Sequence, residues 1–404
     1  MKKTLIYTSL ALAIMQSYSA SAEIRFNGFA SIKAGIASSD DILYEYDDEI
    51  DFKNESLFAI QASADMGDKL SATAQIMAKG RNDFEAEFEW AFLTYELTET
   101  LQVSAGRIRT PFYKYSDYLD VGFAYPWVRP PRSIYNIGFA TIEGISLYHS
   151  DMFGDWDVAT QFIYGNFNDT VKPFLYNENA YPVDIQDALG LSVSMTRDWF
   201  NFRVGYLQGD LSTDFAAVSP AVASILNGLR AFDQALIGLG AQPLGLEQKA
   251  QDVEMVEDPA SFLDVSINID YNDFLINTEW SKLTIDDSFS ADREGWFVSV
   301  GKRIGDFTPY IVIEHFDSEL DESLYQDFPT LTLPIPELQQ NYAALQAGVQ
   351  GLVFSDKVDN DAWTVGVRYN FHPSAAFKIQ YTENDDKFMN QTSSLISFGV
   401  DLVF

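Results

Sequence analysis

Apolar and polar residues alternate along most of the chain from residue 23 onward, which is the pattern of strands with two unlike faces. In the first segment, Glu23 to Ile36, one face carries Ile24, Phe26, Ala30, Ile32 and Ile36, and the other carries Arg25, Asn27, Ser31 and Lys33. The alternation recurs at 58–64, 70–76, 189–195, 200–206, 263–271, 363–371 and 377–381. These segments approach the roughly ten residues that a tilted membrane-spanning strand requires.

Short turns and long connections separate these segments. Tight turns are predicted at seven sites: 67–69, 98–100, 154–155, 197–198, 272–273, 305–306 and 372–374, where Gly, Asn, Asp or Pro favours the backbone angles of a hairpin in most cases. Longer polar connections are expected at eight sites: 37–54, 79–84, 110–140, 166–186, 210–261, 284–293, 317–361 and 383–392. Fifteen connections in alternating order join sixteen strands, which is how bacterial outer-membrane barrels are built.

The last residues of the sequence predict how the sheet closes. Apolar side chains occupy one face of a final strand at Ile396, Phe398, Val400, Leu402 and Phe404. An unpaired strand here would expose backbone groups and an apolar edge, so we expect it to pair with the first strand. The predicted fold class is therefore all-β: a transmembrane antiparallel barrel with a water-filled lumen. A soluble sandwich or propeller is the alternative, and it leaves the one-sided loop lengths unexplained.

The first 22 residues have the order of a secretory signal peptide. Lys2 and Lys3 precede an apolar run from Leu5 to Met15, and the small residues Ala20-Ser21-Ala22 follow. We expect cleavage near Ala22 and a barrel domain over 23–404. The apolar run is too short for a spanning helix. The chain has no cysteine, which excludes disulfides and cysteine-based metal or nucleophile chemistry.

Composition agrees with a membrane barrel and excludes some partners. The chain has 59 acidic and 26 basic residues, a net charge of -33 that makes nucleic acid an unsuitable partner. Aromatic residues make up 15% and hydrophobic residues 47%, yet the mean hydropathy is -0.09. Such fine mixing is typical of strands that face lipid on one side and water on the other, flanked by aromatic girdles.

At this point the sequence resembles the Gram-negative porins. The resemblance lies in the signal peptide, the opening strand, the segment Ala105-Gly106-Arg107-Ile108-Arg109-Thr110-Pro111-Phe112 and the aromatic last strand. It implies a homotrimer in the outer membrane with long extracellular loops, a third loop folded inward, and lipid and lipopolysaccharide as neighbours. It also implies that Phe404 forms part of the signal that the barrel-assembly machinery recognises, and that small solutes or ions pass through.

The third long connection, 110–140, is the candidate functional segment. In and beside it the charged residues are Arg107, Arg109, Lys114, Asp117, Asp120, Arg129 and Arg132, and the tyrosines nearest its start are Tyr113 and Tyr115. Charged rings set selectivity in pores, so these residues predict a constriction with a positive field. Arg107 and Arg109 share one parity, and a lipid-facing pair would cost ~2–4 kcal/mol each, so the lumen is favoured. Binding lipopolysaccharide phosphates or neutralising nearby carboxylates is the alternative role.

Two connections contain helical periodicity, at 218–238 and 338–352, and we expect these helices to pack on the rim rather than plug the pore. Catalysis is not expected: the three histidines are His149, His315 and His372, and His149-Ser150-Asp151 puts neighbours on opposite strand faces. No cofactor or metal site is expected. A plugged structural barrel that acts as an adhesin or surface receptor remains the alternative to a channel.

Overall fold

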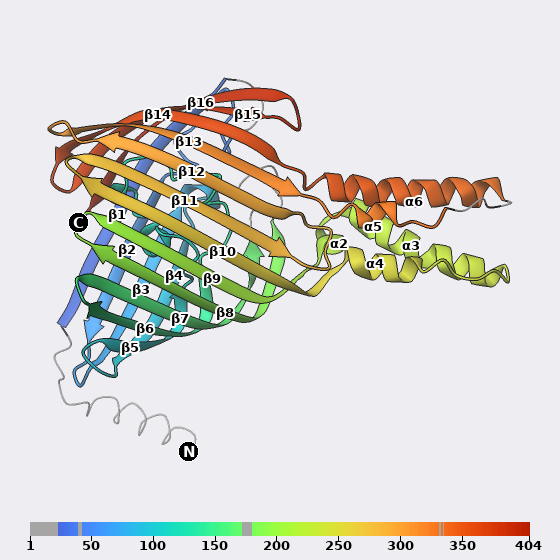
Figure 1. The fold of residues 1–404 in the computed structure, drawn as a ribbon, viewed down its shortest axis with the longest axis horizontal. Coiled ribbons are helices and arrows are strands. Elements are labelled where there is room, and N and C mark those ends of the chain that lie inside the picture. Colours follow the sequence, from blue (N-terminus) through green and yellow to red (C-terminus); the bar gives the residue numbers. More distant parts are fainter. Residues whose placement is uncertain (1–22, 39–42, 172–179, 331–332, 334) are drawn as a thin grey trace, which may run out of the picture.

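Sixteen antiparallel strands form one closed barrel in the computed structural model, which describes residues 23–38, 43–171, 180–330, 333 and 335–404 (Figure 1). The predicted signal peptide, 1–22, lies outside these residues. The strands are β1 (Glu23–Ala37), β2 (Leu57–Asp65), β3 (Leu70–Lys79), β4 (Ala86–Glu96), β5 (Leu101–Arg109), β6 (Thr141–Phe153), β7 (Trp156–Val171), β8 (Tyr181–Arg197), β9 (Phe200–Thr213), β10 (Met255–Tyr271), β11 (Phe274–Ile285), β12 (Asp292–Lys302), β13 (Phe307–Glu319), β14 (Asp359–His372), β15 (Ala375–Asp386) and β16 (Gln391–Val403).

The barrel closes between its first and last strands, as the terminal alternation predicts. β1 pairs with β16 from Phe29 opposite Val403 to Ala37 opposite Leu395. Beyond the ladder, Gly28 and Phe404 exchange two backbone hydrogen bonds of 2.8 and 2.9 Å. The ring of Phe404 is 59% exposed and stacks on Phe58 of β2 with ring centroids 5.9 Å apart. Closure therefore leaves no sheet edge to be exposed to lipid.

Strand alternation separates an apolar outer face from a polar inner face. On β13, Ile311 and Ile313 face outward and are half-exposed, whereas the alternate residues Val312 and Glu314 are buried. The same rule holds on β16, where Ile396 faces outward and Ser397 is fully covered inside the barrel. The outer side chains contact lipid in a membrane, and the inner ones line the lumen or meet the loop folded into it.

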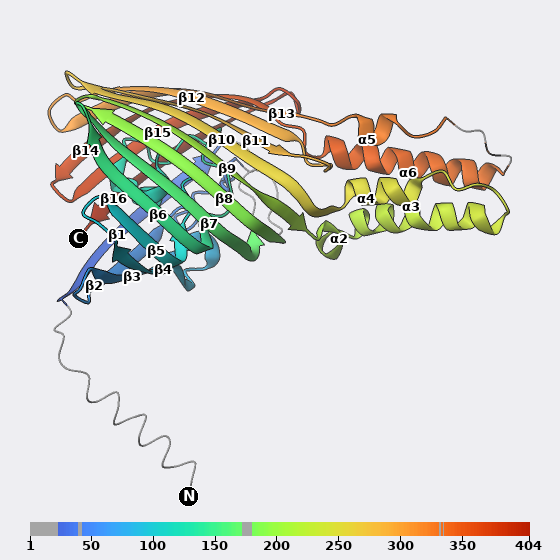
Figure 2. The ribbon, with the colours of Figure 1, turned by 60° about the horizontal axis from the view of Figure 1, so that its bottom comes forward.

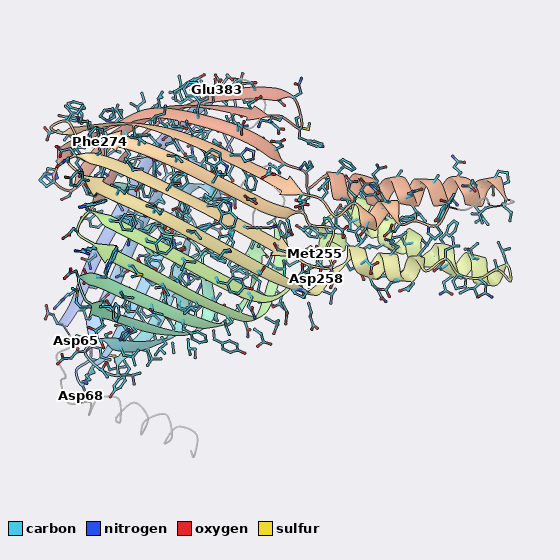
Figure 3. All side chains as sticks on the ribbon, in the orientation of Figure 1. Asp65, Asp68, Met255, Asp258, Phe274 and Glu383 are labelled. Atoms are coloured by element: carbon cyan, nitrogen blue, oxygen red, sulfur yellow. The ribbon has the colours of Figure 1, made fainter. Side chains whose placement is uncertain are left out.

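All seven predicted tight turns lie at one end of the barrel and the long connections at the other. Figure 3 marks the turn end with Asp65 and Asp68 and the opposite end with Met255 and Asp258. Some loop bounds were wrong, because strands continue past the point where strict alternation ends. The expected loop 166–186 is largely strand in β7 and β8, and 383–392 shrinks to a short turn after Asp386. Bulges in β7 and β8 explain the lost periodicity there.

Helices extend from the loop end: α2 (Phe215–Val218), α3 (Pro220–Gly238) and α4 (Leu246–Val253) after β9, and α5 (Ser323–Gln326) and α6 (Pro336–Phe354) after β13. Both predicted helices are present, and Ser219 caps α3 through a hydrogen bond from the Val222 amide. The expected rim packing is wrong. Figures 1 and 2 show a helical extension that projects away from the barrel, with Leu229 and Val349 buried between its helices.

The apolar stripes of α3 and α6 face each other and bury one another's side chains. A side chain at Gly228 would clash with Leu345, and one at Gly348 would press on Ile225, so glycine allows the two helices to approach closely. Among the described residues, no helix combines the length and the apolar character needed to cross a membrane.

Candidate functional site

The third loop, 110–140, leaves β5 at Arg109, enters the lumen and returns to β6 at Thr141. Its backbone is bound by side chains of the barrel wall at widely separated strands. The Arg203 guanidinium of β9 donates to the carbonyl of Pro111, and Gln380 of β15 accepts from the Val128 amide at 2.9 Å. The indole N–H of Trp127 donates to Ser299 of β12 at 2.9 Å. The loop is therefore folded inward, as the resemblance implies.

Basic side chains of the wall satisfy several carbonyl groups of the loop. The Lys378 ammonium on β15 is fully buried, donates to the carbonyls of Gly122 and Trp127, and lies 2.8 Å from the Asp401 carboxylate on β16. Arg368 on β14 donates to the carbonyl of Phe123 at 2.6 Å. Buried carbonyls without partners are costly, so these charged donors stabilise an irregular backbone inside the barrel.

An aromatic cluster fills the space between the loop and the wall. The Tyr115 ring meets Trp127 edge-on at 5.6 Å, and Trp127 in turn meets Phe297 of β12 at 5.6 Å. Phe112 packs against Phe262 of β10 at 5.3 Å. Edge-to-face contacts at these distances are favourable beyond their buried area. The loop thus rests on the inner faces of β10 and β12 as part of a packed core.

A first group of buried charges joins the loop to β3 and β4. Arg109 lies 2.8 Å from Glu89 and 3.0 Å from Asp120, and Lys79 lies within 3.4 Å of both carboxylates. The Arg109 guanidinium also donates to the carbonyl of Ser116 at 2.6 Å. Burial alone would raise the pKa of the Asp120 carboxyl, but Lys79 and Arg109 outweigh burial and lower the pKa to about 2.

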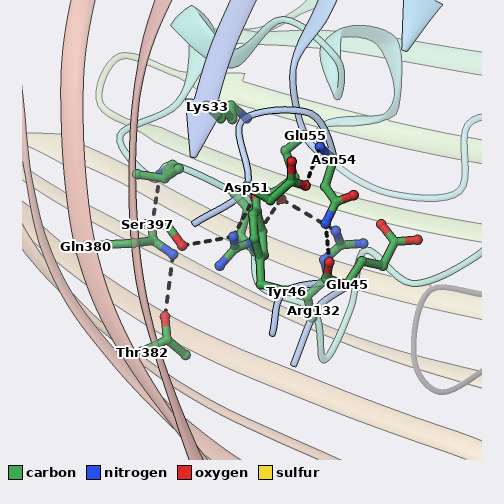
Figure 4. A network of polar contacts seen from close by, with 12 residues as sticks. Lys33, Glu45, Tyr46, Asp51, Asn54, Glu55, Arg132, Gln380, Thr382 and Ser397 are labelled. Carbon is green, nitrogen blue, oxygen red and sulfur yellow. Dashed lines mark hydrogen bonds and ion pairs between the residues drawn. The ribbon is translucent and has the colours of Figure 1, made fainter. Parts of the chain in front are cut away.

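A second group joins the third loop to the first connection, as Figure 4 shows. Arg129 donates to Glu55 at 2.8 Å and to Ser397 of β16 at 2.9 Å, and Arg132 lies 3.6 Å from the same Glu55 carboxylate. The Arg129 guanidinium also lies over the Tyr46 ring at 5.5 Å. Burial would raise the pKa of Glu55, but Arg129 lowers it to about 2.

A third group lies on β9, β10 and β11. Arg203 is 2.6 Å from Asp264, which is fully buried. The neighbouring Glu279 accepts from the Lys114 amide at 2.8 Å and from the Tyr135 hydroxyl. Tyr115 donates to Asn277 at 3.0 Å. Both ends of the loop are therefore fastened to one patch of wall.

The structure brings most predicted residues together but separates the two arginines of β5. Arg107 and Arg109 share a parity, yet only Arg109 contacts the inward loop in the described hydrogen bonds and ion pairs. Arg107 pairs across the sheet with Glu143, on the face of Ala105 and Ile145, and lies 3.7 Å from Glu143 and 3.8 Å from Asp169. Gly106, between Ala105 and Arg107, has a positive φ and lies so close to the Ala91 carbonyl of β4 that a side chain there would clash.

Several site residues were missed from the sequence, chiefly Glu55, Glu89, Glu279 and Lys378. Glu89, Glu279 and Lys378 are charges at or beside inward positions of strands, and Glu55 lies in the first connection shortly before β2. Charged residues at mid-strand inward positions, such as Lys378 between Phe377 and Ile379, were the signal that was available. Asp117 is exposed and Lys114 is half-exposed, so the side chains of these two predicted residues remain accessible to water beside the packed loop.

A closed sixteen-stranded barrel with an apolar outer face and a loop inside its lumen defines the class of outer-membrane channels. A family model described as Gram-negative porin matches residues 8–391, so the chain belongs to this family. It is an outer-membrane porin for passive diffusion, and family and fold point to a channel rather than to an enzyme.

Solved structures show the same fold at low sequence identity. The anion-selective porin from Comamonas acidovorans is 10% identical with a TM-score of 0.56, over 95% of this chain and 100% of that chain. The outer-membrane channel DcaP of Acinetobacter baumannii is 11% identical with a TM-score of 0.54, over 96% and 99%. OmpF of Salmonella typhi in complex with daunomycin is 12% identical with a TM-score of 0.53, over 96% and 99%. No curated protein matches the sequence significantly.

Glu55→Gln is expected to loosen the third loop, because it leaves the buried Arg129 without its counter-charge, at a cost of ~3–5 kcal/mol. In wild type the carboxylates of Glu55 and Asp120 have pKa values below their usual range, so their stabilisation is complete above pH ~4.5 and is lost as the pH falls towards 2. Current noise in bilayer recordings should be constant from pH 8 to 5 and rise near pH 3. Equal noise in Glu55→Gln and wild type at pH 7 would contradict this anchor.

Proposed function

We propose that the third loop is the constriction of this porin and sets the size limit for small hydrophilic solutes and ions. The observation that carries the proposal is the set of buried contacts that hold the loop: ion pairs tie it to β3, β4 and the first connection, and hydrogen bonds tie it to β9–β11. A loop that is attached to the wall at several points is restricted to one conformation, so the opening beside it has a constant size. Its exposed edge, with Lys114 and Asp117, is the part that meets solute.

In this proposal the basic residues have two roles. Arg109, Arg129 and Arg132 face carboxylates at 2.8 to 3.6 Å and act as anchors, so their charge is largely cancelled. Lys114 and Asp117 contribute the local field at the edge of the loop, because neither is consumed by a buried ion pair. A positive field from the arginines, as first expected, is therefore weakened by their partners.

The double variant Arg129→Ala plus Arg132→Ala tests the constriction. Without these side chains the loop loses its link to Glu55, so we expect a larger and noisier single-channel conductance in planar bilayers. Arg197→Ala is the control, because Arg197 is in an exposed ion pair with Asp155 at a turn. Unchanged conductance in the double variant would refute the size-limiting role. Wild-type barrels that insert without current would instead indicate a plugged receptor or adhesin.

We further propose a homotrimer that assembles through the outer faces of β2–β5. These strands have only 9 to 11 residues, whereas β7, β8 and β10 have 16 or 17. Their outward residues include a patch of adjacent alanines, with Ala62 opposite Ala74, Ala64 opposite Ala72 and Ala74 opposite Ala91. Short strands and small side chains produce a flat wall that suits contact with a second barrel.

Ala74→Trp is expected to break the trimer, because an indole on this flat patch would hold the barrels apart. Light scattering in detergent should then report mainly monomers for this variant and trimers for wild type. Val298→Trp on β12 is the matched control, since Val298 also faces outward but lies on the opposite part of the wall. A trimer that survives Ala74→Trp would place the interface elsewhere.

Phe404 is proposed as part of the signal for barrel assembly, after export directed by the predicted signal peptide over 1–22. The ring is exposed at the turn end and is therefore accessible to another protein. We expect Phe404→Ala to reduce the amount of protein in the outer membrane while the purified chain still folds into detergent micelles. Equal loss in cells and in micelles would mean that Phe404 acts through stability alone.

A further inference from the structure

The charged residues of the inner wall are concentrated on one side of the barrel. On β9–β16 the inward-facing charges include Arg203, Asp264, Glu279, Glu314, Lys378 and Asp401, and none is more than 6% exposed. Every one contacts the third loop or an oppositely charged neighbour that does. These six charges meet the loop or its partners and are withdrawn from water, whereas Arg368 of β14 also donates to the loop but is half-exposed.

The remaining half, β2–β8, has a different inner surface. Along the middle of these strands the inward-facing polar side chains that the structure describes are neutral, as in Gln61, Ser63, Thr73, Thr94, Ser104 and Gln161. We call these six residues the neutral wall. The charged exceptions lie towards the loop end of β3 and β4: Lys79 and Glu89 bind each other, and Glu87 is exposed opposite the inward Met77. Each residue of the neutral wall is half-exposed, in contrast to the buried charges opposite.

Neighbouring hydroxyl and amide groups of this surface are hydrogen-bonded across the strands. Ser63 and Thr73 are 3.3 Å apart, and Thr94 and Ser104 are 2.8 Å apart. Gln161 donates to Ser146 at 3.1 Å. Such pairs fix the side chains while each oxygen retains a lone pair for water or solute. The surface is therefore an ordered array of uncharged donors and acceptors.

We propose that the neutral wall lines the open path beside the third loop and favours uncharged hydrophilic solutes rich in hydroxyl or amide groups, with weak preference between cations and anions. This inference rests on the proposed function, because it assumes that solutes pass beside the loop. It concerns the substrate class of that path and not the size limit.

The physical reason is the absence of a fixed field of one sign along this surface. Selectivity between ions arises from charged rings or oriented dipoles at the narrow part of a pore. Hydroxyls and amides can replace the water around a sugar or an amide one bond at a time, with little net cost. An ion gains less from them than from a carboxylate or a guanidinium.

Charges at the ends of the strands do not reverse this conclusion. Asp65, Glu96 and Asp157 are exposed at the turn end, where the barrel opens to water. At 0.1 M salt the Debye length is about 10 Å, so exposed charges at a mouth are screened from the middle of the barrel. The carboxylates at the turn end therefore affect the entry of ions at low salt. They do not add charge to the neutral wall in the middle of the barrel.

The test compares three solutes of nearly equal size in proteoliposomes: D-glucose, D-glucuronate and D-glucosamine. Wild-type protein should pass glucose at least as fast as either charged analogue. In a planar bilayer with a potassium chloride gradient, the reversal potential should lie near zero. Proteoliposomes without protein provide the background.

Gln161→Glu is the matched variant, because it adds one charge to the neutral wall with almost no change in shape. One unit charge about 7 Å away in water changes ion occupancy by roughly threefold, so glucuronate should slow by about that factor while glucose is unchanged. Thr94→Asp against Thr94→Asn repeats the comparison on β4, where both substituents have the same size.

The outcomes separate this inference from the function on which it depends. The proposal for the neutral wall is refuted if wild-type protein conducts with a strong preference for cations or anions. It is also refuted if neither Gln161→Glu nor Thr94→Asp changes the ion preference. Both results are compatible with a porin. An inserted, folded barrel without current or solute flux overturns both this inference and the proposed function. Glucose flux with a reversal potential near zero, shifted to cation preference by both acidic variants, supports the proposal.

Discussion

Backbone groups that leave water need partners, and this requirement governs both the barrel and the loop inside it. In the wall, the strands satisfy one another around a closed ring, from β1 with β2 to β16 with β1. The third loop has no ladder, so side chains of the wall must serve its carbonyls and amides. Lys378, Arg368 and Gln380 do so from β14 and β15. The fold of the loop is therefore set by the wall as much as by its own sequence.

The need for hydrogen-bond donors to the backbone of the third loop determines where charged side chains lie in the barrel wall. Several cationic donors at the loop are accompanied by a carboxylate, as in Lys378 with Asp401 and Arg129 with Glu55. Buried charges are tolerated when paired and hydrogen-bonded, and removing one partner is far more costly than removing both. The buried ion pairs therefore stabilise the loop and do not face the solute path. The polar side chains along the uncovered side of the lumen are mainly Ser, Thr and Gln.

Much of the barrel could be predicted from the sequence because its signal is local. Alternation of apolar and polar residues is visible within most strands, and six of the seven tight turns contain Gly, Asn, Asp or Pro, which favour them. The bounds of the loops were less predictable, since bulges in β7 and β8 interrupt the alternation without ending the strands. The helices α3 and α6 were visible from their periodicity, but their mutual packing depends on two connections far apart in the chain.

The candidate site was predictable as a segment and not as a set of contacts. The segment 110–140 can be recognised from the sequence alone, because arginine, tyrosine and proline are unusually frequent in it. Its partners are remote in sequence: Arg129 meets Glu55 74 residues away, and Lys114 meets Glu279 165 residues away. Pairing over such distances is fixed by the closure of the barrel, which no local pattern encodes. Arg107 illustrates the limit, because its parity alone did not show that its neighbours would be Glu143 and Asp169.

The inward fold of the third loop is tested most directly by a cross-link between Val128→Cys and Gln380→Cys with a short bifunctional thiol reagent, since the Val128 amide lies 2.9 Å from the Gln380 side chain and the chain has no cysteine of its own. A reagent is needed because the glutamine side chain, which the cysteine shortens, spans part of the distance between the two residues. A loop folded against β15 predicts that the pair cross-links readily in the assembled barrel. Thr364→Cys plus Thr382→Cys, paired within the wall, is the positive control. Cross-linking of the control pair without cross-linking of the loop pair would contradict the account.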